Sequence, residues 1–162
     1  MEKFKISHPF WQVMGIGALA GFRSTAAPVI TSHILSHHHS KSLESSPLSF
    51  MQSETVSKAL KVIALSEIVM DKLPSTPNRI KASVIGARCL SGALAGASIY
   101  KASGGNAIAG VLLGATAAFA STFGSFYLRI GATKKSKLFD PVVGAIEDAL
   151  VIGAGVGLVK IA

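Results

Sequence analysis

Residues 9–31 read PFWQVMGIGALAGFRSTAAPVIT, an apolar stretch that is long enough to cross a bilayer and carries a single cation, Arg23. An interrupting arginine is unlike the apolar region of a cleaved secretory signal, so we expect this stretch to be kept as a first membrane helix. Four further stretches are similar, and the predicted spans are residues 9–31, 57–73, 80–100, 106–130 and 139–161. The sequence thus predicts an all-α fold, a polytopic membrane bundle of about five transmembrane helices.

The composition supports this class of protein. Of the 162 residues, 49% are hydrophobic and 15% are charged, and the mean hydropathy is +0.50. These values exclude a disordered chain and a disulfide-rich secreted one, and the single cysteine, Cys89, cannot form an intramolecular disulfide. We expect a single transmembrane domain over residues 1–162, with a Ser- and His-rich loop at 32–56 as its one sizeable external segment.

The chain carries 16 Lys and Arg against 8 Asp and Glu. In a soluble protein this excess would favour a nucleic acid partner, but membrane proteins place basic residues in cytoplasmic loops, so we expect the lipid bilayer and no nucleic acid. With five spans, nine basic residues fall on the side of the N-terminus: Lys3, Lys5, Lys72, Arg79, Lys81, Arg129, Lys134, Lys135 and Lys137. Five fall on the other side: Lys41, Lys58, Lys61, Lys101 and Lys160. The difference predicts a cytoplasmic N-terminus and an external C-terminus.

Two stretches of the chain are similar to each other. Residues 17–25, GALAGFRST, share six of nine residues with residues 114–122, GATAAFAST, and each stretch is followed by a span that carries acids. Because one span separates the two pairs, they would cross in opposite directions, and an inverted repeat of two helical hairpins is one interpretation. The alternative is chance similarity between small-residue helices, since residues 92–96 repeat the letters GALAG.

Ionisable residues inside the spans are the strongest indication of function. Each costs roughly 2.5–3.5 kcal/mol at mid-bilayer and therefore needs a partner, water or a shifted pKa. With two hydroxyl neighbours, they form the set of candidate ion- or substrate-binding residues: Glu67, Asp71, Glu147, Asp148, Arg23, Arg88, Ser24 and Thr25. Acids of the second and fifth spans would meet between helices and hold a cation or relay protons. The alternative is that the arginines neutralise these acids as ion pairs that only fix helix packing.

Residues 21–28, GFRSTAAP, place hydroxyl side chains and Pro28 within the first span. The segment allows a broken helix whose free N–H groups and Arg23 would face an anion, or whose carbonyls would face a cation. The other interpretation is a continuous helix that Pro28 kinks, with Ser24 and Thr25 bonded back to their own turn.

Glycines four residues apart recur at 17 and 21, at 92 and 96, and at 110 and 114, and the last span holds three more at 153, 155 and 157. Small residues at this spacing let helix backbones approach closely where lipid gives no hydrophobic drive. We expect these faces to pack within one chain or between the subunits of a homodimer.

Four histidines cluster in the external loop, at His33, His37, His38 and His39. In a helix, His33 and His37 would share a face as metal ligands do, but a flexible, solvated run is the interpretation we favour, and the sequence leaves metal binding open. The chain has no nucleophile elbow, phosphate-binding loop or zinc-protease motif. We therefore expect neither enzyme activity nor a cofactor.

Four motifs extend over most of the chain: GFR at 21–23 with Pro28, EIVMDKLP at 67–74, Arg88 followed by SGALAG at 91–96, and DPVV at 140–143 leading into Glu147 and Asp148. With them the chain resembles the bacterial membrane family called domain of unknown function 4126. The resemblance implies a multi-helix protein of the bacterial inner (plasma) membrane and gives no substrate. The acidic motif is also similar to the Glu, Asp-Lys signature of a cation and proton exchanger family built from inverted repeats, with a spacing here that is one residue longer.

These observations allow three functions. The first is an integral membrane transporter or channel for a small ion or solute, with the acids as cation or proton sites and the arginines as counter-charges. The second is a non-transporting assembly or scaffold protein whose buried charges are structural ion pairs. The third is a lipid-handling protein whose arginines hold a phosphate head group. A cavity that reaches the acids would favour the first.

Overall fold

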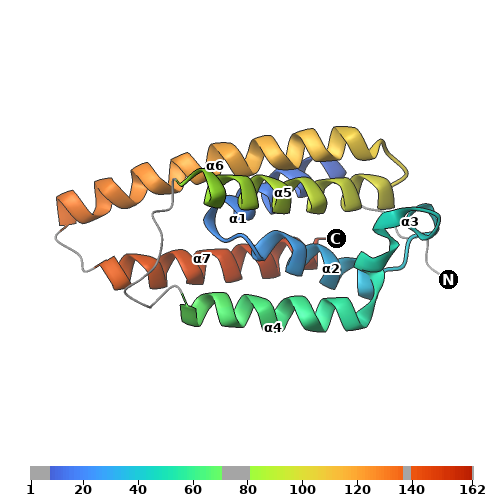
Figure 1. The fold of residues 1–162 in the computed structure, drawn as a ribbon, viewed down its shortest axis with the longest axis horizontal. Helices are drawn as coiled ribbons and strands as arrows, with labels where there is room; N and C mark the ends of the chain where they lie inside the picture. Colours follow the sequence, from blue (N-terminus) through green and yellow to red (C-terminus); the bar gives the residue numbers. More distant parts are fainter. Residues whose placement is uncertain (1–7, 71–80, 137–139, 162) are drawn as a thin grey trace.

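The computed structural model describes residues 8–70, 81–136 and 140–161, and these residues form helices and no strand. The helices are α1 (Pro9–Phe22), α2 (Ala26–His37), α3 (Lys41–Glu44), the 3₁₀ helix η1 (Pro47–Gln52), α4 (Glu54–Met70), α5 (Ala82–Ala102), α6 (Ala107–Ser136) and α7 (Asp140–Lys160). Figure 1 shows α4, α6 and α7 lying roughly along the long axis of the molecule. The prediction of an all-α fold is confirmed.

Among the described residues, two segments are long and apolar enough to cross a membrane, α5 and residues Ala107–Leu128 of α6. They indicate a membrane location, as the composition predicts. Helices α4 and α7 coincide with two more of the predicted spans. At 1.5 Å per residue, the 17 residues of α4 measure about 25 Å, somewhat less than a hydrocarbon core of about 30 Å.

The first predicted span is two helices that fold back on each other. Residues 23–25 are not helical, and the chain reverses there. A Cβ on Gly15 of α1 would lie 3.1 Å from Leu158 of α7, while Ile30 of α2 faces Gly155, one turn earlier on α7. Both arms therefore lie beside the same part of α7, and Figure 1 shows them as a hairpin. The prediction of one crossing over residues 9–31 is wrong, because arms of 14 and 12 residues are each too short to cross.

The hairpin changes which chain ends share a side. The start of α1 and the end of α2 lie toward the end of the molecule that carries α3, η1 and the turn between α5 and α6, and α7 also ends in that direction (Figure 1). The predicted orientation counted residues 9–31 as one crossing, so its count of basic residues on the two sides does not carry over to this fold. A cytoplasmic N-terminus with an external C-terminus stays a prediction.

The same reversal bears on the internal repeat. Gly17 of α1 packs on Gly114 of α6, and Gly21 packs on Ala118 and Ser121 farther along α6. The two similar stretches therefore run in the same direction, side by side. A repeat that relates them has its axis along the helices, so the prediction of an inverted repeat is wrong.

Residues 32–56 are folded onto the end of the bundle. Leu43 and Met51 are fully buried there in a cluster that includes Ala102 of α5. The Ser40 hydroxyl donates to the carbonyl of Ala102 at 2.6 Å, and the Ser40 N–H donates to the side-chain oxygen of Gln52 at 2.6 Å. A loop was expected here, and the segment instead contains two short helices that pack on the bundle, while His37, His38 and His39 are exposed, as expected of a solvated run.

The glycine pairs predicted to pack do so within the chain. A Cβ on Gly96 of α5 would collide with the carbonyl oxygen of Gly110 of α6, and one on Gly92 would collide with that of Gly114. These pairs, with Gly17, are used to join α1, α5 and α6, so they are not available to a second subunit. On α7, Gly153 and Gly157 have no atom within 4 Å of a built Cβ, and a homodimer through that face stays a prediction.

A matched pair of glycines in α5 tests this packing. Gly96→Ala places a methyl group against the backbone of α6, and we expect a loss of about 1–3 kcal/mol of stability from overpacking. Gly86→Ala, in the same helix with nothing within 4 Å of its Cβ, should be neutral or stabilising by up to about 1 kcal/mol. Thermal unfolding in detergent measures both, and equal midpoints for the two variants would contradict the packing described here.

Candidate functional site at the helix break

An ion pair joins the break between α1 and α2 to α7. Arg23 Nε donates to Asp148 Oδ1 at 2.7 Å, and Arg23 Nη2 lies 2.5 Å from the same oxygen. The side chains are 12% and 19% exposed, so the pair is largely shielded from water. Partners in a low dielectric interact far more strongly than on a surface, which makes this pair a strong constraint on how α7 meets the hairpin.

Glu67 of α4 binds the start of α2. Its Oε2 accepts hydrogen bonds from the N–H of Thr25, at 3.2 Å, and from the Thr25 hydroxyl. Thr25 immediately precedes α2, so the carboxylate lies at the positive end of the helix dipole and satisfies an N–H that the helix leaves free. Glu67 is thus held by neutral donors, whereas Asp148 is held by a cation.

Helix α5 binds the end of α1. Arg88, only 6% exposed, donates from Nη1 to the carbonyl of Gly21 at 2.7 Å, and the Ser91 hydroxyl donates to the carbonyl of Ser24. A guanidinium is favourable at the C-terminal, negative end of a helix dipole. Each side of the break therefore meets a charge of the sign that its exposed peptide groups favour.

The structure brings most of the predicted candidate residues together. Six of them take part at the break: Arg23, Ser24, Thr25, Glu67, Arg88 and Asp148. The broken-helix interpretation is confirmed, and the kinked, continuous helix is wrong. Ser24 contributes its carbonyl and not its hydroxyl. Glu147 is half-buried and takes no part in these bonds, and Asp71 lies outside the described residues.

One residue of the site, Ser91, was not predicted. It lies three positions after Arg88 in α5, and residues three apart share a helix face. That spacing, with both side chains polar in an apolar helix, was the available signal.

A pocket of about 430 Å³ lies beside the break, between α2, α4 and α7. Arg23 and Thr25 belong to its lining, so it reaches the residues that hold the two acids. Most other lining side chains are aliphatic, such as Ile30 of α2 and Val151 of α7. The pocket is therefore apolar over most of its lining, with polar residues where it meets the helix break.

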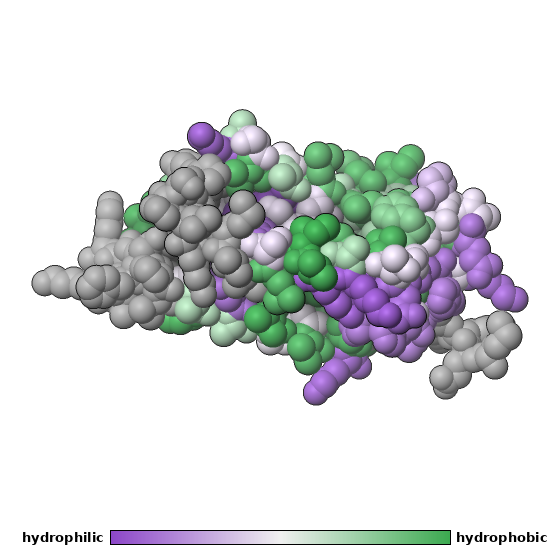
Figure 2. All heavy atoms as spheres, turned by 60° about the horizontal axis from the view of Figure 1, so that its bottom comes forward, coloured by the Kyte–Doolittle hydropathy of each residue, from purple (hydrophilic) through white to green (hydrophobic). Residues whose placement is uncertain are grey.

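The other end of the pocket is basic, with His33, Lys61 and Lys160 in its lining. Lys61 is six residues from Glu67 along α4, about 9 Å, and Lys160 is twelve residues from Asp148 along α7, about 18 Å. Figure 2 turns this side of the molecule forward and shows hydrophilic residues gathered toward one end with apolar ones beside them. The two ends of the pocket thus differ in chemistry.

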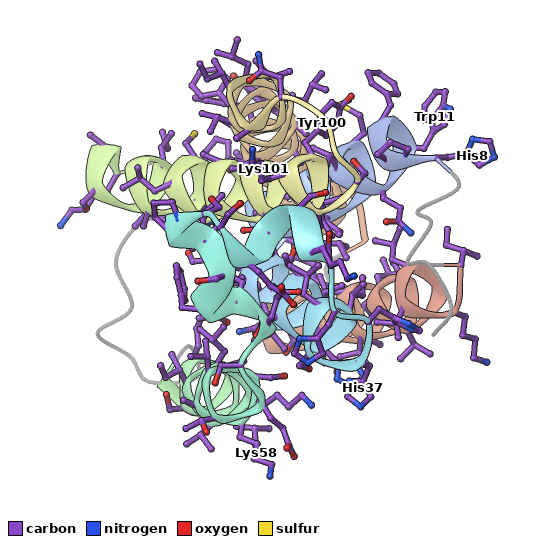
Figure 3. All side chains as sticks on the ribbon, turned by 90° about the vertical axis from the view of Figure 1, so that its right-hand side faces the viewer. His8, Trp11, His37, Lys58, Tyr100 and Lys101 are labelled. Atoms are coloured by element: carbon purple, nitrogen blue, oxygen red, sulfur yellow. The ribbon has the colours of Figure 1, made fainter. Side chains whose placement is uncertain are left out.

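Lys61 Nζ lies 3.1 Å from Nδ1 of His33, which follows the last residue of the first predicted span. Burial lowers the pKa of His33, and the neighbouring Lys61 and His37 lower it further. The imidazole is therefore neutral at neutral pH, and its Nδ1 accepts a hydrogen bond from the Lys61 ammonium group. Figure 3 looks onto this end, where His37 and Lys58 project from α2 and α4. Among the described residues no three His, Cys, Asp or Glu side chains group as metal ligands.

An exposed ion pair on α4 offers a comparison. Lys58 and Glu54 lie 2.7 Å apart with side chains 72% and 75% exposed. The hydrogen bond and charge of Lys58 lower the pKa of Glu54. Water screens such a pair, so it contributes little to stability.

Within the part of the chain that the structure describes, these features define a helical protein with two segments of membrane-spanning length and a short hairpin fixed by buried charges. The chain belongs to the family described as Domain of unknown function (DUF4126), whose model matches residues 11–161. The resemblance found in the motifs is thereby confirmed. No curated protein and no solved structure matches the chain.

Removing one partner of the buried ion pair tests how much the pair contributes to the stability of the fold. Asp148→Asn removes the carboxylate that Arg23 bonds, and we expect a loss of about 3 kcal/mol, the lower end of the range for a buried pair. The double variant Arg23→Gln with Asp148→Asn should recover part of this loss, because both members of the pair are then neutral. Thermal unfolding of the detergent-solubilised protein measures both the loss of stability and its partial recovery.

Glu54→Gln is the control, since it breaks an ion pair of similar chemistry in water. We expect its unfolding midpoint to match that of the parent. If Asp148→Asn also left the unfolding midpoint unchanged, the ion pair would not fix α7 to the hairpin.

Proposed function

We propose that the protein is an integral inner-membrane transporter or channel for a small ion or solute. The helix break is its polar centre, Glu67 and Asp148 are its proton or cation sites, and Arg23 and Arg88 are its counter-charges. The observation that carries the proposal is the pocket of about 430 Å³, whose lining includes Arg23 and Thr25, the partners of the two acids.

General membrane-protein physics supports this function. Non-helical backbone at membrane depth is tolerated where it is buried in protein or lines a cavity. Broken helices in transporters present their free peptide groups and dipole ends to the transported species. Residues 23–25 are non-helical, and two of them line the pocket.

The two acids suggest different tasks. Asp148 has a guanidinium partner, whose loss would leave a charge uncompensated. Glu67 is held by the N–H and hydroxyl of Thr25, so a proton or a cation at its carboxylate displaces no ion pair. We therefore assign Glu67 as the residue that titrates or exchanges partners during transport.

An assembly or scaffold protein is the second candidate. One observation supports it: polar groups at the break already have partners within the fold. Arg23 donates to Asp148, and Arg88 donates to the carbonyl of Gly21. In that case the buried charges fix helix packing, and no ion or solute crosses the membrane through the protein.

Flux measurements on two glutamates of α4 separate the candidates. In proteoliposomes that enclose a pH-sensitive dye, we expect the parent protein to move protons when a Na⁺ or K⁺ gradient is imposed. Glu67→Gln should lower the initial rate by about tenfold or more, the scale of one lost hydrogen bond to a charged group. Glu54→Gln, which changes an exposed carboxylate of the same helix, should leave the rate unchanged.

The scaffold candidate predicts another result. Correctly folded parent and Glu67→Gln proteins would then show the same background flux under every gradient. That outcome would exclude the transport proposal.

A further inference from the structure

We propose that the pocket between α2, α4 and α7 binds a single-chain amphiphile with an acidic head group, a fatty-acid-like carboxylate, with its chain along the aliphatic walls and its carboxylate at Lys61 and Lys160. The inference rests on the proposed function in so far as it names the class of solute. Binding, however, is measured without transport, so the two can fail separately.

The volume fits one acyl chain. A water molecule occupies roughly 30 Å³ of liquid, and if a methylene group is taken as similar in size, a pocket of about 430 Å³ holds roughly fourteen such groups. A second chain would need about twice that space. The size also lies within the range typical of small-molecule sites.

The walls select an apolar body. Between the two polar ends, the lining consists of small and aliphatic side chains, among them Val29, Ile30, Ala64 and Val156. An acyl chain loses nothing by entering and gains close packing.

The charge of the lining selects an anion. It includes Arg23, Lys61, Lys160 and His33 but no acidic residue. Arg23 forms a salt bridge with Asp148. Neither Lys61 nor Lys160 lies within salt-bridge distance of a carboxylate among the described residues. The neutral His33 accepts from Lys61 and so holds its ammonium group at this end of the pocket. A carboxylate here meets two lysines without competing with an existing ion pair.

Equilibrium binding of radiolabelled tetradecanoate to the full chain in nanodiscs of zwitterionic lipid tests the proposal, with empty nanodiscs as background. We expect saturable binding that the double variant Lys61→Gln with Lys160→Gln weakens by about tenfold, through loss of two charge contacts. Lys58→Gln is the matched control, because Lys58 lies one turn before Lys61 on α4 and does not line the pocket. Its affinity should equal that of the parent.

Two further measurements test the chain and the head group. Ala64→Phe fills the pocket from α4 and should abolish saturable binding in a protein that still elutes as the folded species. Methyl tetradecanoate, which keeps the chain and lacks the charge, should compete about tenfold less well than the acid.

Three results would overturn the inference: affinity unchanged in the double lysine variant, equal competition by the methyl ester, or stronger competition by a two-chain anionic phospholipid. The last would assign the pocket to bulk lipid. If tetradecanoate fails to bind while Glu67→Gln still slows flux, only the identity of the solute is wrong. If tetradecanoate binds as expected and Glu67→Gln leaves flux unchanged, the transport proposal fails and the binding site stands.

Discussion

The peptide groups that the break exposes are the constraint on which the remaining structure depends. Three residues leave the helix between Phe22 and Ala26, and free N–H and C=O groups are expensive wherever water is scarce. The chain satisfies them with side chains from distant helices. A cation, Arg88, binds at the carbonyl end of α1, and an anion, Glu67, binds at the N–H end of α2. Both choices agree with the helix dipoles, so the buried charges stabilise the reversal instead of opposing it.

Because these partners come from α4, α5 and α7, the break also fixes where those helices lie. Among the described residues, α4 packs on α2 and η1 and makes no contact with α7. Figure 1 shows α4 at the edge of the molecule, away from α6. The pocket is the space that this arrangement leaves between α4 and α7, with α2 as its third wall. Its inner end is the site of the ion pair because both arise from the same reversal of the chain.

Hydropathy and motifs were sufficient to predict the long helices α4 to α7 and most of the site. The starts of α5, α6 and α7 differ from those of the predicted spans by no more than two residues. Arg23 binds Asp148 and Thr25 binds Glu67, as expected of charged and hydroxyl side chains that need polar partners in an apolar chain. The direction of the chain was not predictable in this way. Hydropathy measures the length of an apolar stretch, and the reversal at residues 23–25 depends on partners 42 to 125 residues away. The inverted repeat and the charge asymmetry both depended on the number of crossings, so the one missed reversal affected both predictions.

The pocket itself bears on the choice between a transporter and a scaffold. Protein interiors are packed about as densely as organic crystals, and voids larger than a water molecule are few. Ion pairs that serve packing alone need no chamber beside them, and an unfilled cavity removes dispersion contacts from its lining. Here about 430 Å³ lies against the residues that bind the two acids, and its far end carries two lysines that have no carboxylate within salt-bridge distance among the described residues. An occupant would restore contacts to that lining, and a lining with basic and no acidic side chains favours an anion.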